Sequence, residues 1–162
     1  MNKSVKLIIL RGKTGTGKST LLSQIEKQLQ FKKIEIDDIK IRNHKSVFKC
    51  VPEIDFKDAG KEASVLLKKG FNVVVEEAFI TLDHLNYFLD EIEKNSTEIV
   101  YIRLECSLQK AILRKTSLRS KIVTNQFLRK TENIAGELIF NTDNLTPELI
   151  VDHIHNYMSS LR

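Results

Sequence analysis

Residues 12–19 read Gly12-Lys13-Thr14-Gly15-Thr16-Gly17-Lys18-Ser19, which matches the pattern GxxxxGK[ST] at every fixed position. A short apolar run rich in branched residues, Lys6 to Leu10, precedes this octapeptide and predicts a buried strand. From Ser19 to Gln30, apolar residues recur at helical spacing. The octapeptide therefore lies between a strand and a helix, which is the context in which this pattern has a structural meaning.

The residue types of the octapeptide suit the binding of phosphate groups. Its glycines let the backbone bend so that several N–H groups point inward, and the helix that follows adds its dipole and its free amides. Lys18 supplies a positive charge for the β- and γ-phosphates, and the Ser19 hydroxyl is the expected Mg²⁺ ligand. The predicted triphosphate-binding residues are Gly12, Lys13, Thr14, Gly15, Thr16, Gly17, Lys18, Ser19 and Thr20.

Length and composition predict one globular domain over residues 1–162. No apolar run approaches the roughly 18 residues of a membrane span, and the N-terminus lacks the core of a signal peptide. Cys50 and Cys106 read as reduced thiols, so we expect a cytoplasmic protein with no membrane partner. The net charge of +5 allows a nucleic acid but equally a small anionic ligand.

Strand-like and helix-like stretches alternate along the chain. Such alternation predicts βαβ units and a five-stranded, mainly parallel sheet covered on both faces, the α/β class with three layers. The expected strands cover residues 6–10, 33–37, 71–75, 98–104 and 138–140, the expected helices cover residues 19–30, 56–69 and 82–94 and begin again near residues 107 and 147, and residues 43–54 are expected to be irregular.

A phosphate-binding loop is compatible with a kinase, a GTPase switch or an ATPase module. No Asn-Lys-x-Asp guanine signature occurs, and the chain is short for the lid subdomain of a machine-type ATPase. With its phosphate loop and strand-end acids, the sequence resembles the small P-loop kinases, a group that includes gluconate, shikimate, adenylylsulfate and polynucleotide kinases and chloramphenicol phosphotransferase. The resemblance implies the three-layer P-loop NTPase fold with a short lid at about residues 114–130.

The resemblance also implies roles for residues beyond the loop. Asp37 and Asp38 stand where these kinases place the acid that takes the proton of the acceptor hydroxyl; we favour Asp37, and capping of a helix is the alternative for both. Lys40 and Arg42 would grip an anionic acceptor. Polynucleotide kinases have an arginine where Lys40 stands, which weakens the likeness to that branch.

Two further groups of residues match the family by position. Glu76 and Glu77 close the third strand, where the family has acidic residues near Mg²⁺; Glu76 is our metal candidate, but strand phase leaves the choice open. Arg114 and Arg119 stand where the family has lid arginines that stabilise charge on the moving phosphoryl group, unless the stretch is a solvated basic helix.

The sequence therefore predicts an ATP-dependent, Mg²⁺-requiring phosphotransferase that acts on a hydroxyl of a small molecule. Lys18, Asp37, Arg114 and Arg119 are the predicted catalytic residues. Two alternatives stay open: a polynucleotide 5′-hydroxyl kinase, whose partner would be a nucleic-acid end, and a nucleotide-binding regulatory module with little catalysis.

Overall fold

The computed structural model of the chain describes residues 5–115 and 117–161, and of residues 117–120 it describes the backbone alone. Helices and strands alternate along nearly the whole chain, as the sequence predicts. In chain order they are β1 (Val5–Gly12), α1 (Lys18–Leu29), β2 (Lys32–Glu35), α2 (Ile36–His44), α3 (Pro52–Lys68), β3 (Val73–Glu77), α4 (Leu82–Leu89), β4 (Thr97–Glu105), α5 (Leu108–Leu113), α6 (Ser117–Phe127), β5 (Leu138–Asn141) and α7 (Pro147–Ser160).

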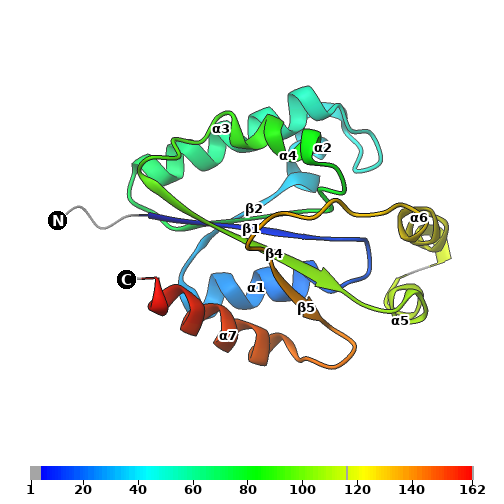
Figure 1. The fold of residues 1–162 in the computed structure, drawn as a ribbon. Coiled ribbons are helices and arrows are strands. Elements are labelled where there is room, and N and C mark those ends of the chain that lie inside the picture. The colour runs from blue at the N-terminus through cyan, green and yellow to red at the C-terminus, as the bar shows by residue number, and fades with distance from the viewer. Residues whose placement is uncertain (1–4, 116, 162) are drawn as a thin grey trace.

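The five strands form one sheet in the order β2-β3-β1-β4-β5, and every neighbouring pair is parallel. Helices cover both faces of this sheet: α3 and α4 lie on one side, and α1 and α7 on the other (Figure 1). The predicted α/β class with a five-stranded parallel sheet is therefore confirmed.

Strand β1 is the centre of the molecule because its side chains feed both apolar layers. Leu7 and Ile9 pack into the core beneath α3 and α4, whereas Ile8 and Leu10 pack into the core beneath α1 and α7. All four are fully buried. A strand that is covered on both faces shows a continuous apolar run instead of an alternating one, which is what the sequence has here.

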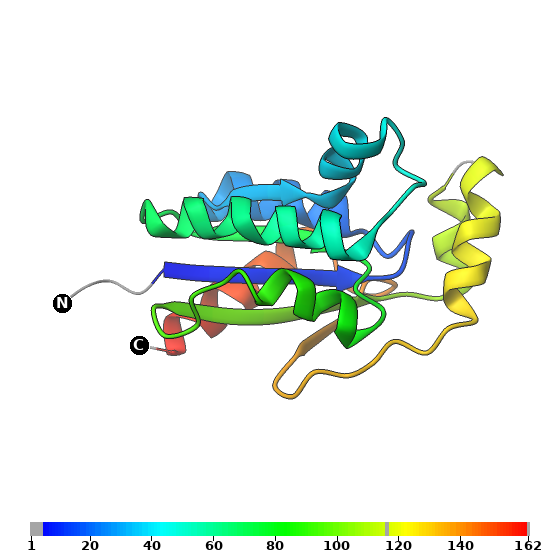
Figure 2. The same ribbon diagram turned by 90° about the horizontal axis from the view of Figure 1, so that it is seen from above.

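At the carboxyl edge of the sheet, two helices lie outside the three layers. Helices α5 and α6 stand beyond the ends of the strands, facing the connection between α2 and α3 across that edge (Figure 2). From β1 the chain passes to β2 and β3 on one side of β1, and from β3 it then passes to β4 on the other side. Open parallel sheets bind ligands at such a point of reversal.

Several predicted boundaries are wrong, among them those of β3, which is expected at residues 71–75 and lies at Val73–Glu77. Strand β2 ends at Glu35 and α2 begins at Ile36, so Asp37 and Asp38 lie in the first turn of a helix. The apolar spacing is compatible with either a strand or a helix, because Ile36 and Ile39 also share a helix face. Acidic residues in a first turn favour the helix. The irregular segment shrinks to residues 45–51, since α3 begins at Pro52, and α4 ends at Leu89, five residues early.

Within the described residues, no helix is long and apolar enough to cross a membrane.

Candidate functional site

A cavity of about 800 Å³ opens at the carboxyl edge of the sheet. Its walls come from the segment between β1 and α1, the ends of β3 and β4, helices α2 and α6, and the turn between β5 and α7. Eleven of the site residues that the sequence predicts or leaves as candidates line it: Thr14, Gly15, Gly17, Lys18, Ser19, Thr20, Asp37, Lys40, Glu76, Glu77 and Arg114.

Gly15 and Gly17 of the loop at residues 12–19 are required for distinct reasons. Gly15 has a φ of 91°, and a Cβ on it would lie 2.9 Å from the Cβ of Ala111 and 2.7 Å from its carbonyl oxygen. Gly17 has a φ of 99° and directly precedes α1. A side chain at either position would be strained, and at Gly15 it would also push α5 away from the loop.

Helix α6 rests on the phosphate loop. Gln126 accepts a hydrogen bond of 2.6 Å from the backbone N–H of Thr14. Lys13 donates to the carbonyl oxygen of Phe127 at 3.4 Å and lies 5.0 Å from the centre of its ring. Lys18 folds back onto the carbonyl oxygen of Lys13 at 3.3 Å. Protein oxygens thus accept hydrogen bonds from the Thr14 amide and the Lys18 ammonium group, the kinds of donor that bind phosphate oxygens.

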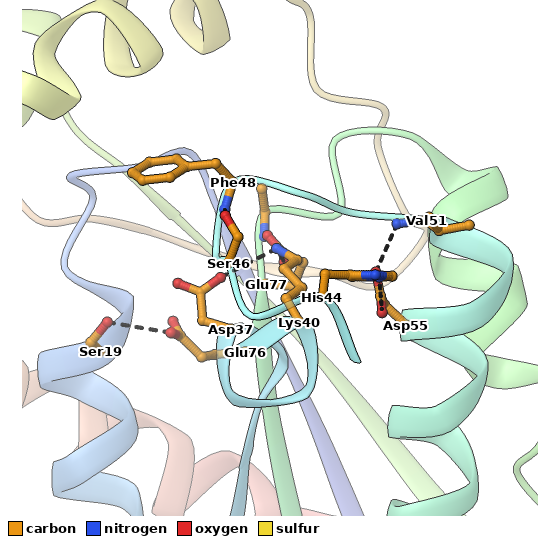
Figure 3. Close-up of polar contacts among 11 residues, drawn as sticks. Ser19, Asp37, Lys40, His44, Ser46, Phe48, Val51, Asp55, Glu76 and Glu77 are labelled. Carbon is orange, nitrogen blue, oxygen red and sulfur yellow. Dashed lines mark hydrogen bonds and ion pairs between the residues drawn. The ribbon is translucent and has the colours of Figure 1, made fainter. Parts of the chain in front are cut away.

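The residues of the predicted magnesium site lie together. The Ser19 hydroxyl donates to Glu76 Oε1 at 3.3 Å (Figure 3). The second oxygen, Glu76 Oε2, is buried and has no hydrogen-bond partner among the described residues. Burial raises the pKa of Glu76 and Lys18 opposes that shift. An orphaned buried carboxylate oxygen beside a serine hydroxyl fits Mg²⁺, which takes few protein ligands when phosphates and water supply the rest.

Glu76 and Glu77, whose orientations strand phase leaves open, have different surroundings in the structure. Glu77 receives a hydrogen bond of 2.5 Å from Lys40 and another of 2.6 Å from the N–H of Ala78. Although burial favours its neutral form, these donors hold the pKa of Glu77 below its ordinary value. Glu77 is therefore the partner of a lysine, and Glu76 is the carboxylate beside Ser19.

Lys40 is the buried cation of this region. Its Nζ lies 2.5 Å from Glu77 Oε2 and 3.3 Å from Asp37 Oδ1, and its side chain is 9% exposed (Figure 3). Burial favours the neutral amine, but the two carboxylates outweigh it and raise the pKa of Lys40. Lys40 therefore lines the cavity as half of an ion pair and not as a free cation.

Arg42 and Asp38 do not reach the cavity lining. Arg42 lies on the exposed side of α2 and pairs with Glu62 of α3 at 3.0 Å. Asp38 is exposed in the first turn of α2. Because α2 begins at Ile36, residues 37 and 40 share a helix face while residues 38 and 42 are turned away from it. The structure thus brings Asp37 and Lys40 to the cavity, and not Asp38 or Arg42.

Arg114 lies where the phosphate loop meets the turn between β5 and α7. Its guanidinium donates to the carbonyl oxygen of Gly15 at 3.2 Å, and to the side chain and carbonyl oxygen of Thr142, both at 2.9 Å. Helix α5 ends at Leu113 and α6 begins at Ser117, so Arg114 and Arg119 do not lie on one continuous helix. The side chain of Arg119 lies outside the described part of the chain.

A buried carboxylate that sequence reasoning missed organises the connection between α2 and α3. Asp55 accepts a hydrogen bond from Asn43 at 3.0 Å. It also accepts one from the N–H of Val51 at 2.7 Å, and its oxygens lie 2.9 and 3.0 Å from His44 Nε2 (Figure 3). Burial works against its charge, yet these partners keep the pKa of Asp55 below its ordinary value. The anchored segment 45–51 carries Phe48 to the cavity wall.

No simple signal in the sequence marks Asp55 or Gln126 as part of this region. An aspartate near the start of a helix is common, because it suits the helix dipole whether buried or exposed. Gln126 lies in a stretch without clear periodicity. Within the described residues, no group of three or more His, Cys, Asp or Glu side chains is placed to hold a metal by itself.

Comparison with solved structures places the fold among small kinases. The APS kinase of Mycobacterium tuberculosis, solved with AMPPNP and APS, superposes with a TM-score of 0.79 at 13% identity, covering 96% of this chain and 98% of the other. A gluconokinase from Sinorhizobium meliloti superposes with a TM-score of 0.68 at 14% identity, covering 99% of both chains. A chain of a Pnkp1/Rnl/Hen1 complex matches with a TM-score of 0.61 at 21% identity, over 72% of this chain and 40% of the other.

No protein-family profile and no curated protein sequence matches the chain. At these identities the structural likeness establishes the fold. The chain has the α/β fold of the small P-loop kinases, which confirms the resemblance drawn from its phosphate loop.

Proposed function

We propose that this protein is an ATP-dependent phosphotransferase that moves the γ-phosphoryl group to a hydroxyl of a small acceptor. The observation that carries the proposal is the convergence of Lys18, the Ser19–Glu76 pair and Asp37 on one cavity. Phosphoryl transfer needs a held triphosphate, neutralised charge and an oriented nucleophile, and little covalent chemistry from the protein. These residues answer those three needs.

The phosphate loop would hold the triphosphate. Amides released from protein oxygens, among them the N–H of Thr14, would turn to phosphate oxygens, and Lys18 would move from the carbonyl of Lys13 to the β- and γ-phosphates. Arg114, already fixed beside Gly15, would add positive charge at the same end of the loop. Ser19 and Glu76 would hold Mg²⁺, which supplies charge neutralisation of the phosphates when bound.

Asp37 is the carboxylate best placed to orient the acceptor hydroxyl and take its proton. It lines the cavity, its side chain is 49% exposed, and the neighbouring Lys40 ammonium group fixes one of its oxygens at 3.3 Å. The other oxygen is left for a ligand. A general base must lie within hydrogen-bonding reach of the proton it removes, and Asp38, which points away from the cavity, fails this condition.

Helices α5 and α6 would act as the short lid. The contacts of Gln126 and Lys13 bring α6 over the phosphate loop, which shields the reacting groups from water. Exclusion of water matters for a kinase because water competes with the acceptor for the phosphoryl group.

Transfer from [γ-³²P]ATP and Mg²⁺ to a library of hydroxyl metabolites tests the proposal. We expect acceptor-dependent label in a product, loss of that label in Lys18→Ala, and a fall of roughly 10²–10⁴-fold in Asp37→Asn. The matched control is Asp38→Asn, which should retain transfer because its side chain lies off the cavity. Tight ATP binding without transfer to any acceptor would overturn the proposal in favour of a regulatory nucleotide-binding module.

A further inference from the structure

The cavity has two halves of different chemistry. The half beside α5, α6 and the turn after β5 holds Arg114 and the loop amides, where the nucleotide belongs. The other half, which we call the acceptor half, is formed by Asp37, Lys40, Phe48, Cys50, Glu76 and Glu77. Figure 3 labels all of these residues except Cys50, and they come from α2, the end of β3 and the 45–51 connection.

Carboxylates outnumber cations in the acceptor half. With Glu76 assigned to the metal, it contains two carboxyl groups, those of Asp37 and Glu77, and, among the side chains that the structure describes there, one ammonium group, that of Lys40. Lys40 is shared by Glu77 and Asp37 at 2.5 and 3.3 Å. A negatively charged acceptor would have to compete with both carboxylates for this lysine, and would meet their repulsion as it approached.

Three other cations of this region make their contacts outside the acceptor half. Arg42, two residues after Lys40 on α2, pairs with Glu62 outside the cavity, and Lys18 lies in the phosphate loop. Arg114 is held on Gly15 and Thr142 at the nucleotide end. The described part of the acceptor half therefore has no cation left over to receive a carboxylate or phosphate of a substrate.

The wall opposite the carboxylates is apolar. Phe48 is 68% exposed in the described structure although the buried network of Asp55 anchors its segment. Cys50 is uncharged there, because burial and the Glu77 and Asp55 carboxylates raise the pKa of its thiol to about 11 despite the nearby Lys40. An exposed aromatic ring on a fixed segment offers a face for stacking with a ligand.

We propose that the acceptor is a neutral or cationic hydroxyl compound with an apolar or aromatic face, and that acceptors carrying a carboxylate or phosphate near the reacting hydroxyl are excluded. This inference rests on the proposed function, because it assigns the acceptor of that same site. It also separates this site from one for a nucleic-acid 5′ end, whose phosphodiesters lie next to the hydroxyl.

The rate at which charged reagents modify Cys50 tests the charge of the acceptor half without any turnover. The full chain is treated with a cationic and an anionic methanethiosulfonate, and mass spectrometry of peptides separates Cys50 from Cys106. The ratio of the two rates is divided by the same ratio in the urea-unfolded chain. We expect the cationic reagent to be favoured about fivefold or more, since potentials of several kT gather in such clefts.

Two controls show that the ratio reports the named carboxylates. Asp37→Asn and Glu77→Gln should each lower the ratio, and 1 M salt should bring it near unity. A ratio of one or less in the wild-type chain at low salt would overturn the inference, whatever the enzyme does with ATP.

Matched acceptor pairs provide the second readout: a sugar and its sugar acid, an amino alcohol and its hydroxy acid, and a 5′-hydroxyl oligonucleotide as the polyanionic probe. Transfer to the neutral or cationic members supports the inference, and transfer to an anionic member alone overturns it. If no hydroxyl compound accepts phosphate while the Cys50 ratio is as expected, the proposed kinase activity is refuted, but the inference that the acceptor half is negatively charged is supported.

Discussion

Replacing Lys40 with methionine should strongly destabilise the protein, because it leaves Glu77 buried without its partner. The Lys40 and Glu77 side chains are 9% and 17% exposed and lie 2.5 Å apart. Removing one member of a buried pair costs about 3–5 kcal/mol, since the remaining charge stays desolvated. In a domain of this size that corresponds to a fall in Tm of about 6–20 °C.

Glu77→Gln should cost less than Lys40→Met, because Lys40 would keep Asp37 as a partner at 3.3 Å. The matched control is Lys61→Met. Lys61 and Asp58 form a pair of 3.4 Å on the surface of α3, with side chains 59% and 37% exposed, and losing it should change stability by less than about 1 kcal/mol.

The loss in Lys40→Met should also depend on pH. In the wild-type protein the pKa of Glu77 lies below its ordinary value of 4.5, so its contribution to stability is present above that value and is lost as pH falls through the lower, folded-state pKa. In Lys40→Met burial should raise the pKa of Glu77, and the carboxyl group then protonates as pH falls. The difference between the two proteins should therefore be largest near pH 7 and shrink toward pH 4.

Urea unfolding of the wild type, the two single variants and Lys61→Met, at pH 7 and pH 4.5, measures these differences. A loss in Lys40→Met no larger than that in Lys61→Met, or one that does not shrink at low pH, would refute the claim that Lys40 neutralises a buried carboxylate.

Three further changes test other parts of the structure. Gly15→Ala should lower the free energy of unfolding in urea by about 2–4 kcal/mol and abolish ATP binding, because the new Cβ meets Ala111. The control Gly70→Ala, at a similar φ of 85° but in open space, should cost only about 1–2 kcal/mol. Equal losses in the two variants would contradict the packing argument. Asp55→Asn should cost about 1–3 kcal/mol near pH 7 and progressively less below the ordinary pKa of 3.8, since the wild-type contribution is lost as Asp55 protonates; a loss in Tm that stays constant from pH 7 to pH 3 would refute this. Gln126→Ala should tighten ATP binding by about 2–10-fold in a titration, because Gln126 occupies the Thr14 amide; weaker binding would mean that Gln126 contacts the nucleotide instead.

The sequence was sufficient for the sheet and the phosphate loop because both leave strong local signals. A four-residue branched apolar run, Leu7 to Leu10, predicts a strand buried on both faces, and its residues occupy both cores as expected. GxxxxGK[ST] predicts the loop because its two fixed glycines answer steric demands: Gly17 has a φ of 99°, and a Cβ on Gly12 would lie 2.6 Å from the carbonyl oxygen of Leu104.

The acceptor side was harder to predict because its geometry depends on where a helix begins. Ile34 and Ile36 alternate as in a strand, yet the chain turns into α2 at Ile36, and this choice decides that Asp37 and Lys40 face the cavity and Arg42 does not. Whether a charged residue is free or paired depends on a partner far along the chain, as with Lys40 and Glu77. Periodicity carries no information about such pairs.

Titration of ATP into the protein, with and without Mg²⁺, tests the central claim that the cavity is a magnesium-dependent triphosphate site. Calorimetry should show one site per chain, with affinity that falls when Mg²⁺ is removed or Glu76 is replaced by Gln, and no measurable binding in Lys18→Ala. Absence of binding to the wild-type chain, or equal affinity in Lys18→Ala, would contradict it.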